Sequence, residues 1–428
     1  MKNRKALALI AILALVAAAC GGSDEVAEVE VETTEAPATT EAPATTVAAP
    51  ASDPLVLASL MPLSGDLASL GPGIALGAAL AVEQINAAGG INGQPVQLIE
   101  GDSGCDGAVA LTSLNDVIAQ GAQGVMGAAC SGTSLAILDT AIAAEVVMVS
   151  PSNTSPQFTK IDKKGFYART APSDLLQGDV LASLLVEDGV QTVSIISRAD
   201  SYGRGLAEAT AAAFEAAGGT VKTIVYHATD ATEFTSEVTA VGKGAPEAIV
   251  GILFPETGCG VLKPAFEQGL LDTPWYMTDG VKDAGLASLC GLGTALDGFK
   301  GTAPGSAAGE AKDAFEAAYA GVSADGSPTF IFAPQAYDAV MLMAISAAAN
   351  GVTGPEIASG LVAASSGGEK CIGVACIALA ADGVDVDYVG ASGEVELNAV
   401  GDPTAATYDI WTTEGDTNPV LKSVDFGS

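Results

Sequence analysis

Histidine is almost absent from this sequence, since His227 is the only one in 428 residues. Serine and cysteine nucleophiles usually need a histidine base, and the segment VYHATDAT around His227 resembles no catalytic motif. The sequence also lacks the GxSxG, Walker and HExxH motifs. Few side chains remain to bind zinc, because there is one histidine and the cysteines are better explained as disulfide pairs. We therefore expect a protein that is not an enzyme and holds no metal and no cofactor.

Basic residues are also scarce. Lys and Arg number 17 against 51 Asp and Glu, which gives a formal net charge of −34. Nucleic-acid phosphates need lysine and arginine partners, so this balance argues against a nucleic-acid partner. Hydrophobic residues nevertheless make up 49% of the chain, which excludes wholesale disorder. The length favours two lobes or domains over one ordinary core.

Long apolar runs are missing beyond the N-terminus, so we expect no transmembrane helix. Residues 1–20 begin with the basic MKNRK and continue with ALALIAILALVAAA, which is too short to span a bilayer comfortably. Small residues then precede Cys20. The segment resembles a bacterial lipoprotein signal, in which Cys20 would carry lipid and become the mature N-terminus. Ala17 stands where such signals usually have leucine, so an ordinary secretory signal is the alternative; both predict a location outside the cytoplasm.

Residues 21–53 are predicted to be a disordered acidic tether. TTEAPA occurs twice between Thr33 and Ala44, after the acidic run DEVAEVEVE. Pro, Thr, Ala and Glu without apolar periodicity cannot bury enough surface to fold. We interpret the acidic run as solvated charge and not as a calcium site. With a lipid on Cys20, the tether would hold the folded part near the outer face of the membrane.

The chain has seven cysteines. Without Cys20, six remain, which is an even number for an oxidising compartment. Six cysteines allow 15 pairings. Proximity along the chain favours three of them: Cys105–Cys130, Cys259–Cys290 and Cys371–Cys376.

Apolar strands alternate with amphipathic helical stretches after Pro54. LVLASLMP, PVQLIEGDS, GAQGVMGA and VVMVSP read as strands, and the segments between them as helices. The alternation pauses near Arg169 and restarts at QTVSIISRAD, which predicts a second α/β lobe. Each lobe should hold a mostly parallel sheet flanked by helices. In such sheets ligands bind at the loops that follow the carboxyl ends of strands.

Two of those loops carry clustered hydroxyl groups. CSGTS lies between a predicted strand and helix, where Ser131, Thr133 and the free N–H groups of a helix N-terminus would suit a carboxylate. SPSNTSP follows the next strand and offers Thr154. The alternative is that these hydroxyls only cap helices, as serine and threonine often do.

Seven segments, in order, resemble the leucine/isoleucine/valine-type periplasmic binding proteins, the solute receptors of bacterial amino-acid ABC importers. The similarity runs from about Leu55 to near the C-terminus and is strongest up to Asp279. The segments are MPLSGDLASLG, ALAVEQINAAGGINGQPVQLIEGDSGCD, GAACSGTS, VSPSNTSPQFT, YARTAPSDLLQG, DSYGRGLAEA and YDAVMLMAISAA.

The resemblance implies a two-lobe clamshell with three crossover strands that closes over a small ligand. We assign residues 54–171 plus 303–390 to lobe I, and residues 172–302 plus 391–428 to lobe II. The implied partners are a small-molecule solute, with an amino acid favoured, and the ABC permease subunits. We expect a monomer that contacts the membrane only through its lipid anchor.

Family roles transfer to named positions of lobe I. Ser131 matches the serine that holds the ligand α-carboxylate. Asn153 and Thr154 match positions that bind the ligand through backbone and hydroxyl groups. Leu70 stands where many relatives carry an aromatic residue, so the side-chain preference is open.

In lobe II, Tyr202 matches an aromatic residue that lines the cleft. Phe254 stands roughly where the family often has tyrosine. Asp279 matches an acid that takes the ligand ammonium, although it is one methylene shorter than the glutamate common there. The pattern favours an α-amino acid, with urea, an amide or an aromatic acid as alternatives. A further alternative is a sensor that passes its closed state to a signalling partner.

Overall fold

The computed structural model describes residues 53–426. The predicted signal at 1–20 with Cys20, and the predicted tether at 21–53 apart from its last residue, lie outside the described residues. Within the described part, no helix is both long and apolar enough to cross a membrane.

A parallel sheet in the order β2-β1-β3-β4-β5 forms the centre of the first lobe. Its strands are β1 (Val56–Met61), β2 (Gln97–Asp102), β3 (Gly124–Gly127), β4 (Val147–Ser150) and β5 (Tyr167–Arg169). Strands β1, β3 and β4 are buried along their whole length, as expected where helices cover both faces. The helices are α1 (Gly71–Ala87), α2 (Gly107–Ala119), α3 (Ser131–Ala143) and α4 (Gln157–Lys160).

The second lobe holds a mixed sheet in the order β15-β14-β10-β9-β8-β6-β7. Its parallel strands are β6 (Thr192–Arg198), β7 (Thr220–His227), β8 (Ala248–Ile252), β9 (Trp275–Met277) and β10 (Lys300–Pro304). Two antiparallel strands complete it, β14 (Ala406–Thr412) and β15 (Val420–Phe426). The helical elements are α5 (Asp174–Glu187), α6 (Ser201–Ala216), α7 (Thr235–Val241), α8 (Pro255–Glu267), η1 (Leu270–Asp272), η2 (Asp279–Val281), α9 (Leu286–Cys290) and η3 (Gly293–Leu296).

The chain then returns to the first lobe. Helix α11 packs against α1 and also contacts β3 and β4. The returning elements are α10 (Glu310–Val322), α11 (Ala333–Asn350), α12 (Gly354–Gly360), β11 (Glu369–Ile372), α13 (Ala375–Ala381), β12 (Val386–Gly390) and β13 (Gly393–Glu394). Strands β11, β12 and β13 form a small sheet of their own.

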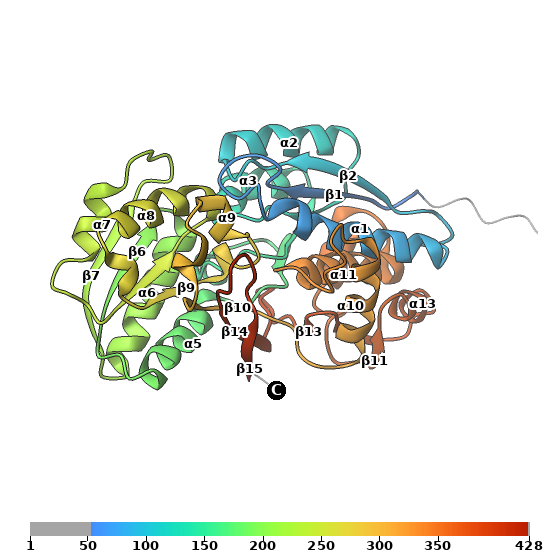
Figure 1. Ribbon diagram of the computed structural model, residues 1–428. Coiled ribbons are helices and arrows are strands. Elements are labelled where there is room, and N and C mark those ends of the chain that lie inside the picture. The colour runs from blue at the N-terminus through green and yellow to red at the C-terminus, as the bar shows by residue number, and fades with distance from the viewer. Residues whose placement is uncertain (1–52, 427–428) are drawn as a thin grey trace, which may run out of the picture. The chain divides into compact units, whose positions relative to one another are not determined.

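Figure 1 shows the two lobes side by side, with β6, β7 and β9 in one and β1, β2, α10, α11 and α13 in the other. Three segments connect them, at residues 170–173, 305–309 and 395–405. The expected two-lobe α/β fold is therefore confirmed. The exact lobe boundaries stay a prediction, with β10 lying in the second sheet and β13 in the small one.

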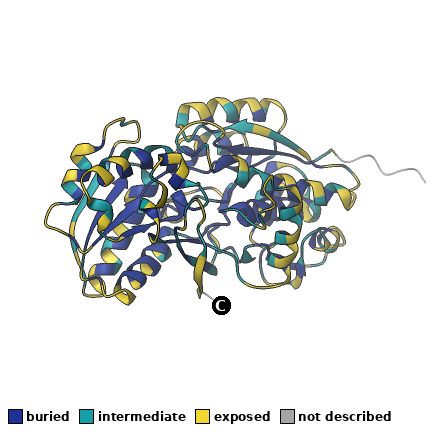
Figure 2. Ribbon diagram, in the orientation of Figure 1, coloured by how far each residue is buried: buried dark blue, intermediate teal, exposed yellow. Residues whose placement is uncertain are grey.

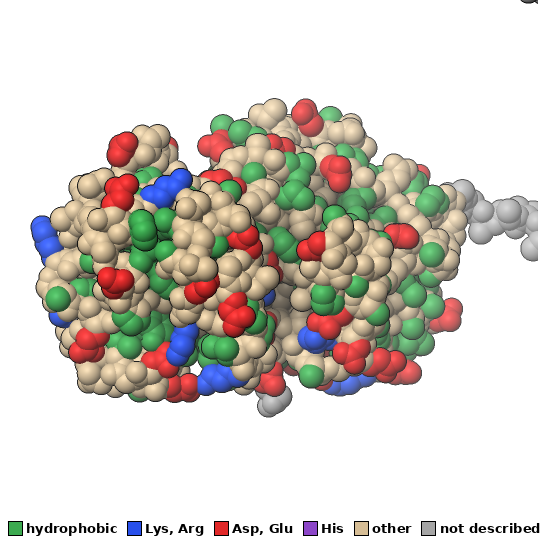
Figure 3. All heavy atoms as spheres, viewed as in Figure 1, with side chains coloured by type: hydrophobic (Ala, Val, Ile, Leu, Met, Phe, Trp, Pro, Cys, Tyr) green, Lys and Arg blue, Asp and Glu red, His purple; other side chains and the backbone are tan. Residues whose placement is uncertain are grey.

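Burial follows this layered plan. In Figure 2 the inner strands of both large sheets are buried, while the edge strands β2, β7 and β15 and the outer helices are partly exposed. Figure 3 shows acidic side chains scattered over the visible face and basic ones few and apart. The six cysteines of the described part form the three disulfides that sequence proximity favoured. Cys105–Cys130 ties the loop after β2 to the start of α3.

Candidate functional site

A small cavity lies where strand ends of the two lobes meet. Its volume is about 20 Å³, roughly room for one water molecule, so the lobes are closed on one another here. The lining residues come from both lobes: Leu67, Leu70, Ile74, Ala129, Ser131, Ser152, Tyr202, Phe254, Asp279, Gly280 and Phe332. Five of the predicted site residues are thus brought together. Asn153 and Thr154 are fully buried in the loop beside them.

Asp279 follows β9 and is the acid of the cavity wall. Its side chain accepts hydrogen bonds from Gln177 Nε2 at 2.8 Å and from the Tyr202 hydroxyl at 2.9 Å. Tyr202 Oη also lies 2.9 Å from Thr278 Oγ1. Burial raises the pKa of Asp279 to about 6, although the two hydrogen bonds act in the opposite direction. The carboxyl group is thus partly protonated just below neutral pH.

Asp174 is a second acid that the sequence reasoning missed. It is the first residue of α5, one helical turn before Gln177, and it is fully buried. Burial, and next the charge of Asp279, raise its pKa well above the usual value. The Thr154 hydroxyl lies beside it and lowers that pKa, but no hydrogen bond of normal geometry joins the two. Among residues 53–426, neither carboxylate oxygen of Asp174 has a hydrogen-bond partner.

A signal for Asp174 was present in the segment YARTAPSDLLQG. An acid at the first position of a helix is common, because it interacts well with the helix dipole. That ordinary explanation made the residue easy to overlook. Only the structure shows that the Asp174 carboxyl group is buried and that Asp279 and Thr154 lie near enough to shift its pKa.

The donor side of the site is the N-terminus of α3. Ser131 is its first residue and is only 3% exposed. The N-cap residue of this helix, Cys130, makes no side-chain cap hydrogen bond. The N–H groups of the first turn have no partners inside the helix. Thr154 Oγ1 is also buried without a hydrogen-bond partner among the described residues.

Asn153 is used to hold its loop. Its Nδ2 donates to the carbonyl oxygens of Ala128 and Ala129, at 3.0 and 2.8 Å, and its Oδ1 accepts from the Tyr167 hydroxyl at 2.9 Å. Its main-chain oxygen accepts from Arg169 Nη1 at 3.0 Å. These contacts fix the loop after β4, which carries Thr154.

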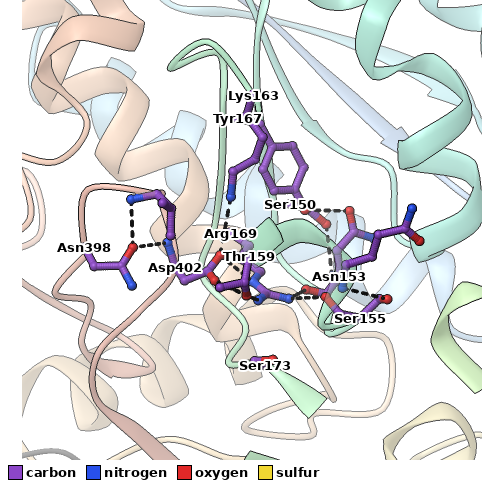
Figure 4. A network of polar contacts seen from close by, with 12 residues as sticks. Ser150, Asn153, Ser155, Thr159, Lys163, Tyr167, Arg169, Ser173, Asn398 and Asp402 are labelled. Carbon is purple, nitrogen blue, oxygen red and sulfur yellow. Dashed lines mark hydrogen bonds and ion pairs between the residues drawn. The ribbon is translucent and has the colours of Figure 1, made fainter. Parts of the chain in front are cut away.

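Arg169 is the centre of the network in Figure 4. The guanidinium is fully buried and makes paired contacts with Asp402, Nε–Oδ1 at 2.9 Å and Nη2–Oδ2 at 3.0 Å. Its Nη1 also donates to the Ser155 carbonyl oxygen at 2.9 Å. Burial works to raise the pKa of Asp402, but the charge and hydrogen bonds of Arg169 outweigh it, so that pKa is lowered. The ion pair therefore anchors the loop of Asn153 and Thr154.

An apolar wall completes the site. Tyr202 and Phe254 stack with ring centroids 5.4 Å apart, and the Arg198 guanidinium lies 3.9 Å from the Phe254 ring centroid. Leu67, Leu70, Ile74 and Phe332 of the first lobe face the same cavity. The cavity wall thus offers the Ser131 hydroxyl, the Asp279 carboxyl group and an apolar surface. Asp174 and Thr154 are buried but lie outside that lining.

Comparison with known proteins identifies the family of the chain. The model of the periplasmic binding protein family matches residues 54–370. The chain is 29% identical over 315 residues to the leucine-, isoleucine-, valine-, threonine-, and alanine-binding protein of Pseudomonas aeruginosa, covering 72% of this chain and 81% of that protein.

Two solved structures share the fold. The branched-chain amino acid transporter substrate-binding protein LivJ of Streptococcus pneumoniae, in complex with isoleucine, superposes with a TM-score of 0.72 at 22% identity, over 88% of this chain and 100% of that one. A solute-binding protein of an ABC transporter from R. palustris, in complex with benzoate, superposes with a TM-score of 0.70 at 18% identity. The match covers 88% of this chain and 98% of that one. The family match covers most of the chain, and the resemblance read from the sequence is confirmed: the chain belongs to the periplasmic binding protein family.

Proposed function

We propose that this protein is the extracytoplasmic substrate-binding subunit of an ABC importer and captures a branched-chain or other small apolar α-amino acid between its lobes. The observation that carries the proposal is the buried pair of Asp174 and Asp279. A ligand with one positive group would neutralise a site that is otherwise costly to bury.

The ammonium group of the ligand would bind at this pair. Both acids have raised pKa values because they are buried, and Asp279 adds to the shift of Asp174. A cation between them favours their ionised forms. The orphaned oxygens of Asp174 and the hydroxyl of Thr154 would gain the partners that they lack.

The ligand carboxylate would bind at the start of α3. Unpaired first-turn N–H groups and the positive end of the helix dipole stabilise an anion there. Ser131 Oγ has only a weak contact of 3.5 Å from the Ser155 N–H, so its hydroxyl is available to donate. Carboxylate and ammonium would therefore be held at two ends of one site, as an α-amino acid requires.

The side chain of the ligand would meet Leu67, Leu70, Ile74, Phe254 and Phe332. All five are apolar, which favours an aliphatic side chain over a charged one. This agrees with the amino acids in the name of the Pseudomonas aeruginosa relative and with the isoleucine bound by the Streptococcus pneumoniae protein.

An aromatic acid is the chief alternative, since a structural neighbour holds benzoate. Benzoate has a carboxylate for the α3 N-terminus but no cation for Asp174 and Asp279. It would leave two buried acids without a counter-charge, which is unfavourable. Urea and amides could donate to the acids but would leave the α3 N-terminus without an anion.

Calorimetry can separate these ligands. We expect leucine or isoleucine to bind, and the matched carboxylic acid that lacks the amino group to bind at least about 30-fold more weakly, as for loss of a buried charge partner. Benzoate or urea binding more tightly than every amino acid would contradict the proposal. No ligand should be chemically altered on incubation with the protein.

Delivery to a permease and attachment through Cys20 complete the proposal. Cells without this protein should lose uptake of the amino acid that binds in calorimetry, and uptake that is unchanged would remove the importer role. Cys20→Ser should move the protein from the membrane fraction to the soluble fraction, because a lipid chain would be its anchor. We also propose that the protein acts as a monomer, which light scattering checks.

A further inference from the structure

A second group of contacts joins the lobes outside the ligand cavity. It lies between the loop at residues 62–70 of the first lobe and the start of α8 in the second. Asp66 of the loop is the centre of these contacts. The same loop supplies Leu67 and Leu70 to the cavity wall.

Asp66 caps a helix of the opposite lobe. Helix α8 begins after Phe254 without a side-chain cap of its own. The N–H of Thr257, at the third position of α8, donates to Asp66 Oδ1 at 2.8 Å, and the Thr257 hydroxyl donates to Oδ2 at 3.0 Å. An N-cap side chain usually makes this bond to the third N–H of its own helix. Here a carboxylate from the other lobe makes it and also faces the positive end of the helix dipole.

Asp66 also pairs with Arg198, whose side chain is 3% exposed. Arg198 Nε donates to Asp200 at 2.8 Å, and the guanidinium covers the ring of Phe254 at 3.9 Å. Phe254 stacks on Tyr202, which donates to Asp279. A continuous series of contacts therefore leads from Asp66 of the first lobe to the acid of the ligand site.

A neighbouring bond strengthens the junction. The N–H of Ser69, in the same loop, donates to Glu256 Oε1 at 3.1 Å. Glu256 precedes Thr257 in the first turn of α8. Every one of these interlobe bonds requires the lobes to be closed, because the two partners belong to different lobes.

We propose that Asp66 is a closure latch: by capping α8 and pairing with Arg198 it stabilises the closed state without touching the ligand. This inference rests on the proposed function only in one respect, namely that a ligand in the cleft binds more tightly when the lobes are closed. A stabilised closed state raises the apparent affinity for any ligand that binds it, up to the factor by which closure is favoured.

The test measures closure directly in ligand-free protein. Spin labels at residues 116 and 267, exposed on α2 and α8, report the distance between the lobes. Asp66→Ala should enlarge the population of open molecules, in which the two labels are far apart. The equilibrium constant between closed and open protein should fall about tenfold, which is the size expected for loss of a helix cap with its ion pair. Asp66→Asn keeps an acceptor for the Thr257 N–H and should give an intermediate result. Asp139→Ala, an exposed acid of the same lobe, is the matched control.

Salt provides an independent check. Raising the ionic strength should reduce the closed population of the unchanged protein more than that of Asp66→Ala, because only the former keeps the interlobe ion pair. Distance distributions of Asp66→Ala identical to those of the unchanged protein, at low and high salt, would overturn the proposal.

The ligand provides the second readout. Amino-acid affinity should fall by up to about tenfold in Asp66→Ala, with faster dissociation. If no amino acid binds the unchanged protein, the proposed function fails while the distance measurement still tests the latch.

Discussion

Lowering the pH should weaken amino-acid binding, because Asp279 must be ionised to pair with an ammonium group. Its pKa is raised to about 6 by burial, with Gln177 and Tyr202 working against the shift. At pH 7 most molecules hold the ionised form, and at pH 5 most hold the protonated form. A ligand that binds the ionised form must then displace a proton.

The size of the effect follows from linkage. Each pH unit below the pKa costs about tenfold in affinity when one proton is displaced, or about 1.4 kcal/mol. We therefore expect the dissociation constant to rise about tenfold between pH 7 and pH 5. Above pH 7 it should change little, since Asp279 is then already ionised.

The same shift affects the stability of the ligand-free protein in a definite direction. The folded state holds the Asp279 proton more tightly than the unfolded chain, whose carboxyl titrates near 3.8. The stability that protonation provides is fully present below about pH 4 and is lost as the pH rises through 6. That loss is about 3 kcal/mol for a shift of this size.

Calorimetry at pH 5, 6 and 7, in buffers of different ionisation enthalpy, measures both the affinity and the displaced proton. Asp279→Asn serves as control, because it keeps the side-chain oxygen that accepts from Gln177 and Tyr202 but cannot titrate. Its affinity should be low and should vary less over this pH range. An affinity of the unchanged protein that varies less than twofold between pH 5 and 7, with no proton displaced, would refute the reasoning.

Three further predictions concern single contacts. At pH 7, Asp279→Asn should weaken amino-acid binding at least about 30-fold, as for loss of a buried charge partner, and unchanged affinity in calorimetry would remove Asp279 from the site. Asp402→Ala should lower the free energy of unfolding by about 3–5 kcal/mol, because it leaves the buried Arg169 unpaired; urea unfolding checks this, with Asp162→Ala at an exposed acid as control. Replacing both cysteines of the Cys105–Cys130 pair by serine should lower the free energy of unfolding by about 3.5 kcal/mol, against about 2 kcal/mol for the Cys371–Cys376 pair. The reason is that the two pairs close loops of different length, with separations of 25 and 5 residues. Equal losses would contradict the loop-entropy argument.

The sequence alone predicted the fold well where hydrophobic periodicity is strong. The strands around Val56, Val125, Val149 and Ile195 lie where the apolar runs indicated, because a parallel sheet buries them on both faces. The small sheet β11-β12-β13 and helices α12 and α13 were not predicted. They are short, and their pattern cannot be distinguished from that of a loop.

The residues that line the cavity could be predicted in part for a similar reason. Ser131, Tyr202, Phe254 and Asp279 follow strand ends, and the rule for parallel sheets places such loops together. Asp174 follows the crossover at residues 170–173, which that rule does not cover. Contacts between lobes, such as Asp66 with Thr257, join residues 191 positions apart, and no local pattern encodes them.

The proposed ligand depends strongly on Asp174, the residue that the sequence pattern did not indicate, and on its neighbour in charge, Asp279. A chain selected only for stability would not keep two buried acids whose charges act on each other, one of them with two unpartnered oxygens, because each raised pKa reports a cost of folding at neutral pH. Such local conflicts persist where a ligand removes them. An ammonium group provides the missing counter-charge, whereas an aromatic acid does not, so the proposed ligand class follows from what destabilises this site.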